Sequence, residues 1–481
     1  MSAALPVAVA LPLVAAGGVV ALRRWPNVRE ATSLVAGIAL AALLIGLWPS
    51  VEQAPRFELW TWLPDISLAL QLEPLGLLFA TVSGVLWPVT TMYSIGYMRG
   101  NHEGNQTRFY FFFALAIASA QLIALSDNLV TLFIGYEILT LATWPLVTHH
   151  GDDEARGGGR TYLALLLTTS IGLLLPAIAW TALLAGGTRF APGGLLPDGI
   201  TTAVLTVLFA LFLFGIGKAA LMPFHRWLPS AMVAPTPVSA LLHAVAVVKA
   251  GVFAVLKVVI YVFGFDLLDA SSAATPMMWV AAFTLIAASL VALTKDDLKA
   301  RLAYSTVSQL AYIVLAATLA TSTAAVGGAL HLATHAAGKI TLFFCAGAIY
   351  TAAHRTRVSE LDGLGRAMPW TFGAFLLASL SIVGLPPLGG TWSKWLLLQG
   401  AAAADQPIML AVMLVGSLLS LAYLLPIPVR AFFRSPATRF EHGEAARAVL
   451  WPLLLTALAC LALFFGAEPL IAPLRTALEM G

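Results

Sequence analysis

The sequence predicts an all-α protein that crosses a membrane many times, and three observations support this fold class. Of the 481 residues, 60% are hydrophobic and only 10% are charged, whereas an ordinary soluble domain has roughly 25% charged residues. The apolar residues are gathered in runs of about 20, which is the length that a helix needs to cross a bilayer. The basic residues lie between these runs in a one-sided pattern. The whole chain, residues 1–481, is therefore expected to form a single transmembrane domain.

Fourteen apolar segments follow one another along the chain, and each is expected to form one transmembrane helix. The first segment has no basic residues before it and is followed by Arg23 and Arg24, the reverse of a secretory signal, so we expect it to be retained as helix 1. Cys345 and Cys460 lie in apolar segments without metal-ligand spacing and are expected to be packing residues. The segments lie at about 3–22, 30–48, 75–98, 108–125, 128–148, 161–186, 202–221, 237–262, 276–294, 302–320, 325–353, 369–400, 407–432 and 448–470.

The loops on one side of the membrane carry most of the basic residues. Loops that follow odd-numbered segments hold 18 of the 26 Lys and Arg residues, and the opposite side holds three, namely Arg56, Arg189 and Arg475. Because basic loops remain in the cytoplasm, both termini are expected outside a bacterial inner membrane. This topology also accounts for the formal charge of +3, which gives no reason to expect nucleic acid as a partner.

The other five basic residues are all lysines inside apolar segments: Lys218, Lys249, Lys257, Lys339 and Lys394. A charge near the middle of a bilayer is costly, so such residues face the interior of a helix bundle or a hydrated cavity. Arginine stays protonated at any accessible pH, whereas a buried lysine can exchange its proton when its surroundings shift its pKa. The absence of arginine from this set favours proton transfer over static ion pairing.

Four further ionisable residues join these lysines inside apolar segments. Glu137 is the acidic residue expected well inside a helix, and His243, His331 and His335 are the histidines. In HLATHAAGKITLF, His331, His335 and Lys339 recur every four residues, so they form one stripe on helix 11. Such a stripe, with bridging waters, is suited to relay protons. A metal site is not expected, because the histidines lack the acidic neighbour of a zinc-protease motif.

Simpler interpretations remain open for several of these residues. Lys257 lies near the outer end of helix 8, where its side chain could extend to the membrane surface. His243 could form an ordinary hydrogen bond across two helices. For the deeper lysines of helices 7, 8 and 11, the alternative is a fixed salt bridge with Glu137, although one glutamate cannot neutralise three lysines.

Two of the lysines lie beside predicted helix breaks. In GKAALMPFHRWLP, Pro223 removes a backbone donor just after Lys218, and in SIVGLPPLGGTWSKWLL two prolines, Pro386 and Pro387, precede Lys394. A broken helix frees backbone carbonyls and is tolerated at membrane depth where it lines a cavity. Helices 7 and 12 are therefore expected to be broken beside a buried lysine.

Interrupted helices in corresponding positions indicate inverted repeats around a site near the middle of the membrane. The first repeat is expected at 108–262, helices 4 to 8, and the second at 276–432, helices 9 to 13. Each has five helices, so the two start from opposite sides of the membrane. The sequence similarity between them is faint, FHRWL in the first against WSKWL in the second.

Four motifs resemble one known family. LMPFHRWLPSAMVAPTPVSALLHAVAVVKAG, AYSTVSQLAY, HLATHAAGK and GLPPLGGTWSK resemble the antiporter-like subunits shared by respiratory complex I, membrane-bound hydrogenases and Mrp cation/proton antiporters. The resemblance covers about residues 75–430. It implies a switching ion pair between helices 5 and 7, which here is Glu137 with Lys218. It also implies a helix 8 lysine or histidine, here Lys249 and His243, and the lysines of helices 11 and 12, here Lys339 and Lys394.

The resemblance also implies a function. Family members carry no cofactor and stand beside other membrane subunits in a larger complex, so a proton-translocating subunit without catalytic chemistry of its own is expected. The sequence ends soon after helix 14, and YSIGYMRGNHEGNQTRFYFFFALA with His243 and Lys249 favours the D-type subunit of a Mrp monovalent cation (Na⁺)/H⁺ antiporter. The alternatives are a proton-pumping subunit of a complex I-like NADH:quinone oxidoreductase or membrane-bound hydrogenase, and a proton-flux subunit of an inorganic-carbon transporter.

A proton path follows as a hypothesis. Protons pass from the broken helix 7 at Lys218 to Lys249 and the helix 11 stripe, and they leave past Lys394. Opening or closing of the pair between Glu137 and Lys218 would push the proton onward.

Other function classes find less support. A membrane-embedded enzyme would need a nucleophile beside a base, or a metal cluster, and the sequence offers neither within its helices. Haem binding is disfavoured because His331 and His335 lie on one helix. Hydroxyl side chains that are candidates for binding sodium are common in membrane helices and stay unassigned; they are Thr140, Ser305, Thr306 and Ser308.

Overall fold

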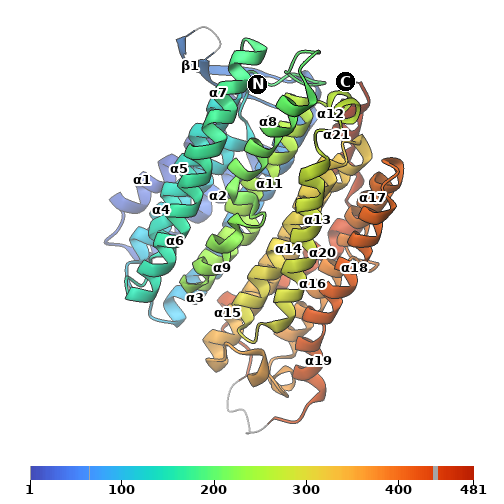
Figure 1. Ribbon diagram of the computed structural model, residues 1–481. Coiled ribbons are helices and arrows are strands. Elements are labelled where there is room, and N and C mark those ends of the chain that lie inside the picture. The colour runs from blue at the N-terminus through green and yellow to red at the C-terminus, as the bar shows by residue number, and fades with distance from the viewer. Residues whose placement is uncertain (1, 64–65, 437–442, 481) are drawn as a thin grey trace.

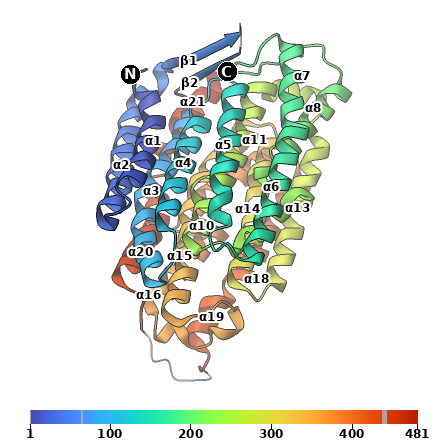
Figure 2. The same ribbon diagram turned by 90° about the vertical axis from the view of Figure 1, so that its left-hand side faces the viewer.

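The helices of the computed structural model run side by side, most of them along one common direction (Figures 1 and 2). The structure describes residues 2–63, 66–436 and 443–480. Each of the fourteen predicted segments contains at least one helix, which confirms the all-α, multi-pass fold class. In this described part, eleven helical stretches are long and apolar enough to cross a membrane, and α8 (Thr202–Gly215) and α16 (Pro369–Val383) are shorter apolar helices.

The remaining helices follow the predicted order. Segments one to six form α1 (Ala4–Ala21), α2 (Pro26–Leu47), α3 (Pro74–Gly100), α4 (Gln106–Ala124), α5 (Leu129–Val147), and α6 (Asp153–Thr169) with α7 (Leu175–Ala185). Segment eight adds α10 (Thr236–Ala240) and α11 (Val247–Val258). The later segments form α13 (Thr275–Thr294), α14 (Leu298–Thr318), α15 (Ser322–Ala353), α17 (Gly390–Ala403), α18 (Pro407–Leu424), α19 (Pro426–Phe433) and α20 (Arg447–Phe465). Three short helices lie between or after the predicted segments: α9 (Trp227–Ser230), α12 (Phe265–Ser271) and α21 (Glu468–Met480).

Both termini lie at the same end of the bundle, at the top of Figure 1, which we name the terminal end. An antiparallel hairpin of β1 (Arg56–Leu63) and β2 (Ile66–Gln71) lies at this end as well (Figure 2). The sequence reading missed this hairpin, because a window of about 20 residues averages short strands with their neighbours. That this end faces the outside of the membrane stays a prediction from the distribution of basic residues.

The centre of the bundle is built around α11 and α15. The helical stretches that contain them, Thr236–Phe263 and Ser322–Ala353, are buried throughout their most apolar windows. α15 packs against α14, α16, α17 and α20, and α11 packs against α14, α15 and the residues just after α8. A helix that is buried on all sides is normally apolar all round, so ionisable side chains on α11 and α15 require a specific reason.

Helix 8, expected as one continuous helix at 237–262, is irregular. π turns at Leu241–Val245 and Val259–Phe263 flank α11, and the backbone departs from helical geometry at Ala246, with φ −126° and ψ −67°. His243 lies in the first π turn. Single π turns inside helices commonly mark functional sites.

The predicted breaks in helices 7 and 12 are confirmed. α8 ends at Gly215, a 3₁₀ turn holds Lys218, and Ala220 has a left-handed φ of 55°. α16 ends at Val383, where Gly384 has φ 95°. Prolines in both stretches prevent the helical hydrogen-bond pattern from continuing, and each break leaves its lysine packed among neighbouring helices.

Close packing holds the first break in place. A Cβ atom on Gly251 of α11 would lie 2.6 Å from the carbonyl oxygen of Lys218 and closer still to the next backbone atoms. Only glycine permits this approach between α11 and the break. In the second break, a Cβ on Gly390 would overlap the carbonyl oxygen of Ser381.

Candidate functional site

Lys218 is fully buried, and its ammonium binds one turn of α5. Its Nζ donates to the Tyr136 carbonyl at 2.9 Å and to the Thr140 hydroxyl at 2.6 Å, and it lies 3.2 Å from the centre of the Tyr136 ring. The backbone N–H of Lys218 donates to the Tyr136 hydroxyl at 2.9 Å, and Trp227 Nε1 donates to the carbonyl of Gly217 at 2.9 Å. Both sides of the break are therefore held by hydrogen bonds.

The expected ion pair between Glu137 and Lys218 is not formed in this structure. No carboxylate oxygen lies within 4.0 Å of Lys218 Nζ among the described residues, and Oε1 of the half-buried Glu137 has no hydrogen-bond partner. Consecutive residues on a helix are about 100° apart. Tyr136 and Thr140 therefore bind the ammonium in place of Glu137, and the fixed salt bridge considered for Lys218 is not formed in this conformation.

The predicted stripe on α15 meets α11 at its centre. Nζ of Lys249 lies 2.5 Å from Nδ1 of His335. The rings of His335 and His331 are stacked with centroids 5.8 Å apart. All three side chains are buried, so this arrangement forms a line of titratable groups across two helices.

The line continues from His331 to the second break. His331 Nδ1 lies 3.0 Å from the Ser393 hydroxyl, and Lys394 is the next residue. Lys394 Nζ donates to the Ser417 hydroxyl of α18 at 2.8 Å and lies 4.6 Å from the centre of the Tyr312 ring. The Tyr312 and Ser417 hydroxyls are 3.1 Å apart. The Tyr312 ring connects His331 with Lys394, because its centre lies 5.9 Å from that of the His331 ring and faces Lys394.

Lys339 and His243 are placed beside α14. Lys339 Nζ donates to the Ser305 hydroxyl at 2.6 Å and to the Leu302 carbonyl at 3.2 Å. His243 Nδ1 lies 2.9 Å from the Thr306 hydroxyl. Of the hydroxyls named as sodium candidates, Thr140, Ser305 and Thr306 thus bind the buried lysines and histidine directly.

The three histidines share one further property. Nε2 of His243, His331 and His335 is buried without a hydrogen-bond partner in the protein. Buried polar atoms nearly always have a partner, which is often an ordered water. These nitrogens are therefore suited to hydrogen-bond water along the line.

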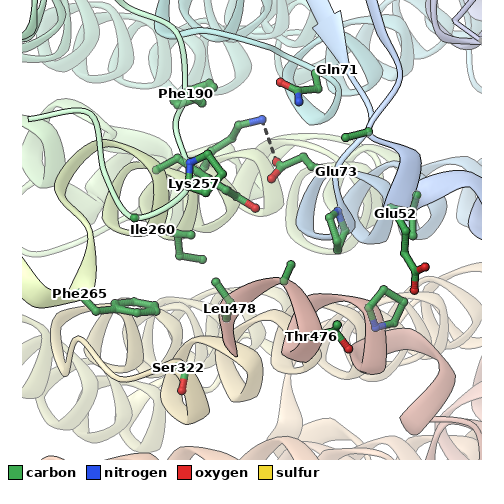
Figure 3. Close-up of a pocket in the computed structure, with 18 of the residues that line it drawn as sticks. Glu52, Gln71, Glu73, Phe190, Lys257, Ile260, Phe265, Ser322, Thr476 and Leu478 are labelled. Atoms are coloured by element: carbon green, nitrogen blue, oxygen red, sulfur yellow. Dashed lines mark ion pairs between the residues drawn. The ribbon is translucent and has the colours of Figure 1, made fainter. Parts of the chain in front are cut away.

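Lys257 differs from the sequence expectation. Its side chain does not extend to the surface, because it is only 1% exposed and its Nζ lies 2.9 Å from Glu73 Oε1 (Figure 3). Nζ also donates to the Ser126 carbonyl at 2.6 Å. Glu73 precedes α3 and was overlooked because it was read as a loop residue.

The sequence analysis missed other residues that contact the buried lysines and histidines, because tyrosine and serine are common residue types. Tyr136 and Tyr312 carry the lysine-facing rings, and Ser393 and Ser417 supply hydroxyls. Tyr312 ends the AYSTVSQLAY motif, and Ser393 directly precedes Lys394. For Tyr312 and Ser393, a position within these motifs was the sequence feature that could have identified them.

A polar cavity of about 370 Å³ opens at the end opposite the termini. Glu103 and His150, in loops on its wall, are 3.5 Å apart. The hydrogen bond that the His150 ring donates to the Glu103 carboxylate raises the pKa of His150 above its ordinary value, against the opposing effect of burial. The pKa of Glu103 is lowered by the same hydrogen bond. This end is predicted from the basic loops to face the cytoplasm.

Comparisons with known proteins agree on one family. A family model described as NADH:quinone oxidoreductase/Mrp antiporter, TM, matches residues 126–420. NADH-quinone oxidoreductase subunit L of Mycobacterium tuberculosis is 31% identical over 475 residues, covering 93% of this chain and 72% of the relative. Subunit N of the same enzyme from Desulforudis audaxviator is 32% identical over 431 residues, covering 85% of this chain and 83% of the relative.

A solved structure shares the fold. The Mrp complex from Dietzia sp. DQ12-45-1b contains a chain that matches with a TM-score of 0.86 and 22% identity, covering 99% of this chain and 97% of that one. The family model spans more than half of the sequence and includes both helix breaks and the α15 stripe. The chain therefore belongs to the NADH:quinone oxidoreductase/Mrp antiporter transmembrane family, as a multi-pass, antiporter-like membrane subunit.

Proposed function

We propose that this chain moves protons along its buried lysines and histidines as one subunit of a larger membrane complex. The observation that carries the proposal is the line from Lys249 through His335 and His331 to Lys394. Its first three members lie at hydrogen-bond or ring-contact distance from one another, and the Tyr312 ring lies between His331 and Lys394. Each member can take up and release a proton. Such a line is costly to bury in a membrane, and its maintenance is explained by transport.

The partners of the lysines support this function. Lys218, Lys339 and Lys394 are bound by hydroxyls, carbonyls and aromatic rings. Neutral acceptors can remain in place when an ammonium becomes an amine. A buried salt bridge would instead leave an uncompensated carboxylate, which is strongly unfavourable.

The two halves of the chain share a similar local arrangement, which supports the proposed repeats at 108–262 and 276–432. Lys218 of broken helix 7 lies over the Tyr136 ring of helix 5. Lys394 of broken helix 12 lies over the Tyr312 ring of helix 10. In two five-helix units that begin at helices 4 and 9, helix 5 corresponds to helix 10 and helix 7 to helix 12.

We assign Glu137 the role of a switch. In this conformation Glu137 is unpaired and Lys218 is bound by Thr140. In a second conformation, an ion pair would draw the ammonium away from Thr140 and hold its proton. Alternation between the two states would pass the proton towards Lys249.

For the complex itself, we propose a Mrp-type monovalent cation (Na⁺)/H⁺ antiporter, in which this chain is the D-type subunit. The sequence features given above support this choice. A proton-pumping subunit of a complex I-like enzyme is the second candidate, favoured by identities of 31% and 32% to relatives named as NADH-quinone oxidoreductase subunits. Mass spectrometry of the proteins that co-purify from native membranes in mild detergent separates the two. Small antiporter subunits alone support the first, and iron–sulfur or flavin subunits support the second.

Transport by a Lys218→Ala variant tests the proton path. The variant complex is expected to assemble and to lose coupled proton movement, measured with a pH-sensitive dye in membrane vesicles. Lys295→Ala, which removes a lysine from a loop outside the buried line, is the matched control and is expected to transport normally. Normal transport by Lys218→Ala refutes the proposed path.

A further inference from the structure

A cavity of about 720 Å³ opens at the terminal end of the bundle (Figure 3). Its walls come from the start of α3, the end of the helix 8 stretch, the start of α15, and the loop that contains Phe190. α21 closes another side with Thr476 and Leu478. No step of the proposed path uses this cavity.

A buried ion pair lies within the cavity wall. Lys257 is 1% exposed and Glu73 is 12% exposed. The Lys257 ammonium is held by Glu73, by the Ser126 carbonyl, and by the Phe190 ring, whose centre is 4.6 Å from Nζ. Figure 3 shows the pair facing the open space between α3 and α21. The pair therefore lies between the protein interior and the cavity.

The charges around the cavity favour cations. Its lining contains three carboxylates, those of Glu52, Glu73 and Asp266, and the single ammonium of Lys257. Glu52 and Asp266 are exposed towards solvent. A cavity lined mainly by one sign of charge, with walls of low dielectric constant, concentrates ions of the opposite sign. Protons and other cations are thus drawn towards the Lys257–Glu73 pair.

α11 connects this pair to the buried line. Lys249 and Lys257 are eight residues apart on the same helix, which corresponds to about 12 Å along its axis. Lys249 contacts the α15 stripe, and Lys257 reaches the cavity. Lys257 is therefore a candidate to link the centre of the line with the terminal end.

We propose that the Lys257–Glu73 pair is a proton-exchange site that connects the buried line to the outer face through this cavity. The proposal rests on the proton-translocating function proposed above. The Lys257 ammonium passes a proton to the Glu73 carboxylate, which leaves an amine and a carboxylic acid. The amine takes a new proton from the interior as the acid releases its proton to water in the cavity, so the carboxylate never faces a neutral amine and the pair returns to its starting state. Uptake from the outer face follows the reverse order.

The rival explanation is a structural salt bridge that ties helix 8 to the start of α3. Lys257→Arg separates the two, because arginine keeps the charge and can bind Glu73 but does not release a proton. An exchange site predicts an assembled complex whose proton transport falls at least tenfold. A structural salt bridge predicts transport within about twofold of wild type, and that result would overturn the proposal.

A double variant controls for the case in which the longer arginine side chain does not fit the buried site of Lys257. Lys257→Met combined with Glu73→Gln removes both charges, so no unpaired charge remains buried. The exchange site again predicts at least a tenfold loss of transport in a complex that contains the normal amount of this subunit. Recovery of transport in the double variant, relative to Lys257→Met alone, would show that the pair is structural.

Chemical labelling tests the route itself. Thr476→Cys places a thiol in the cavity, and Thr201→Cys places one in an exposed loop outside it; the native Cys345 and Cys460 are buried. In right-side-out vesicles, a membrane-impermeant cationic thiosulfonate is expected to label Thr476→Cys several-fold faster than an anionic one, and to lower transport relative to the untreated variant. Labelling of Thr201→Cys is expected to leave transport unchanged. Full labelling of Thr476→Cys without loss of transport would exclude this route.

Lys218→Ala, measured in the same vesicles, separates the two proposals. If Lys218→Ala transports normally, the proton path itself fails. If Lys218→Ala is inactive while Lys257→Arg and the labelled cysteine variant transport normally, the path stands and only the exchange site fails.

Discussion

Gly251 offers a sharp test of how the break in helix 7 positions its lysine. A methyl group at this position would lie 2.6 Å from the carbonyl oxygen of Lys218, whereas ordinary contact begins at 3.4 Å. Gly251→Ala therefore forces the backbone of the break to move away from α11 by about 1 Å or more. The displaced segment carries the ammonium that binds Tyr136 and Thr140.

The expected loss of stability follows from the close packing around Gly251. Overpacking of a dense interior costs about 1–3 kcal/mol, and the atoms that Gly251→Ala meets belong to backbone, which yields less easily than a flexible side chain. Such a cost corresponds to roughly a 5- to 150-fold change in an equilibrium constant. Proton transport is expected to fall further than stability, because the hydrogen bonds of Lys218 depend on the position of the break.

The assay compares Gly251→Ala with Gly157→Ala. A methyl group on Gly157 meets nothing within 4 Å, and alanine favours a helix, so this control is expected to be neutral or slightly stabilising. Loss of folded protein on heating in detergent reports stability, and dye quenching in vesicles reports transport. Wild-type values for Gly251→Ala in both measurements would refute the close packing described here.

Three further predictions concern single contacts. Trp227→Phe removes the indole donor to the carbonyl of Gly217 and is expected to destabilise the protein by about 1–3 kcal/mol, measured by thermal unfolding in detergent, because a buried acceptor loses its partner; unchanged stability contradicts this role. Lys394→Arg is expected to assemble normally and to lose proton transport, since arginine keeps its proton; transport at the wild-type rate argues against proton release at this position. Glu103→Gln replaces the charged carboxylate that raises the pKa of His150 with a neutral amide, so modification of the neutral ring by diethylpyrocarbonate, followed by mass spectrometry, should begin at a lower pH than in wild type; an unchanged midpoint counts against this cause of the raised pKa.

The sequence by itself determined the number and order of the helical segments, the two breaks and most of the buried ionisable residues. These are local properties. A run of about 20 apolar residues is long enough to cross a bilayer wherever it occurs, and proline interrupts a helix through its own missing N–H. The four-residue spacing of His331, His335 and Lys339 likewise places them on one stripe in any helix.

Only the tertiary structure decided which groups face one another. Glu137 and Lys218 were expected to pair. In the structure, the neighbouring Tyr136 and the Thr140 hydroxyl of α5 bind the lysine instead. For Lys257, extension to the membrane surface was one open interpretation, yet Glu73 pairs with it from a distant part of the chain. The partner of a buried charge depends on how whole helices are rotated and packed, and residues far apart in sequence fix that arrangement together.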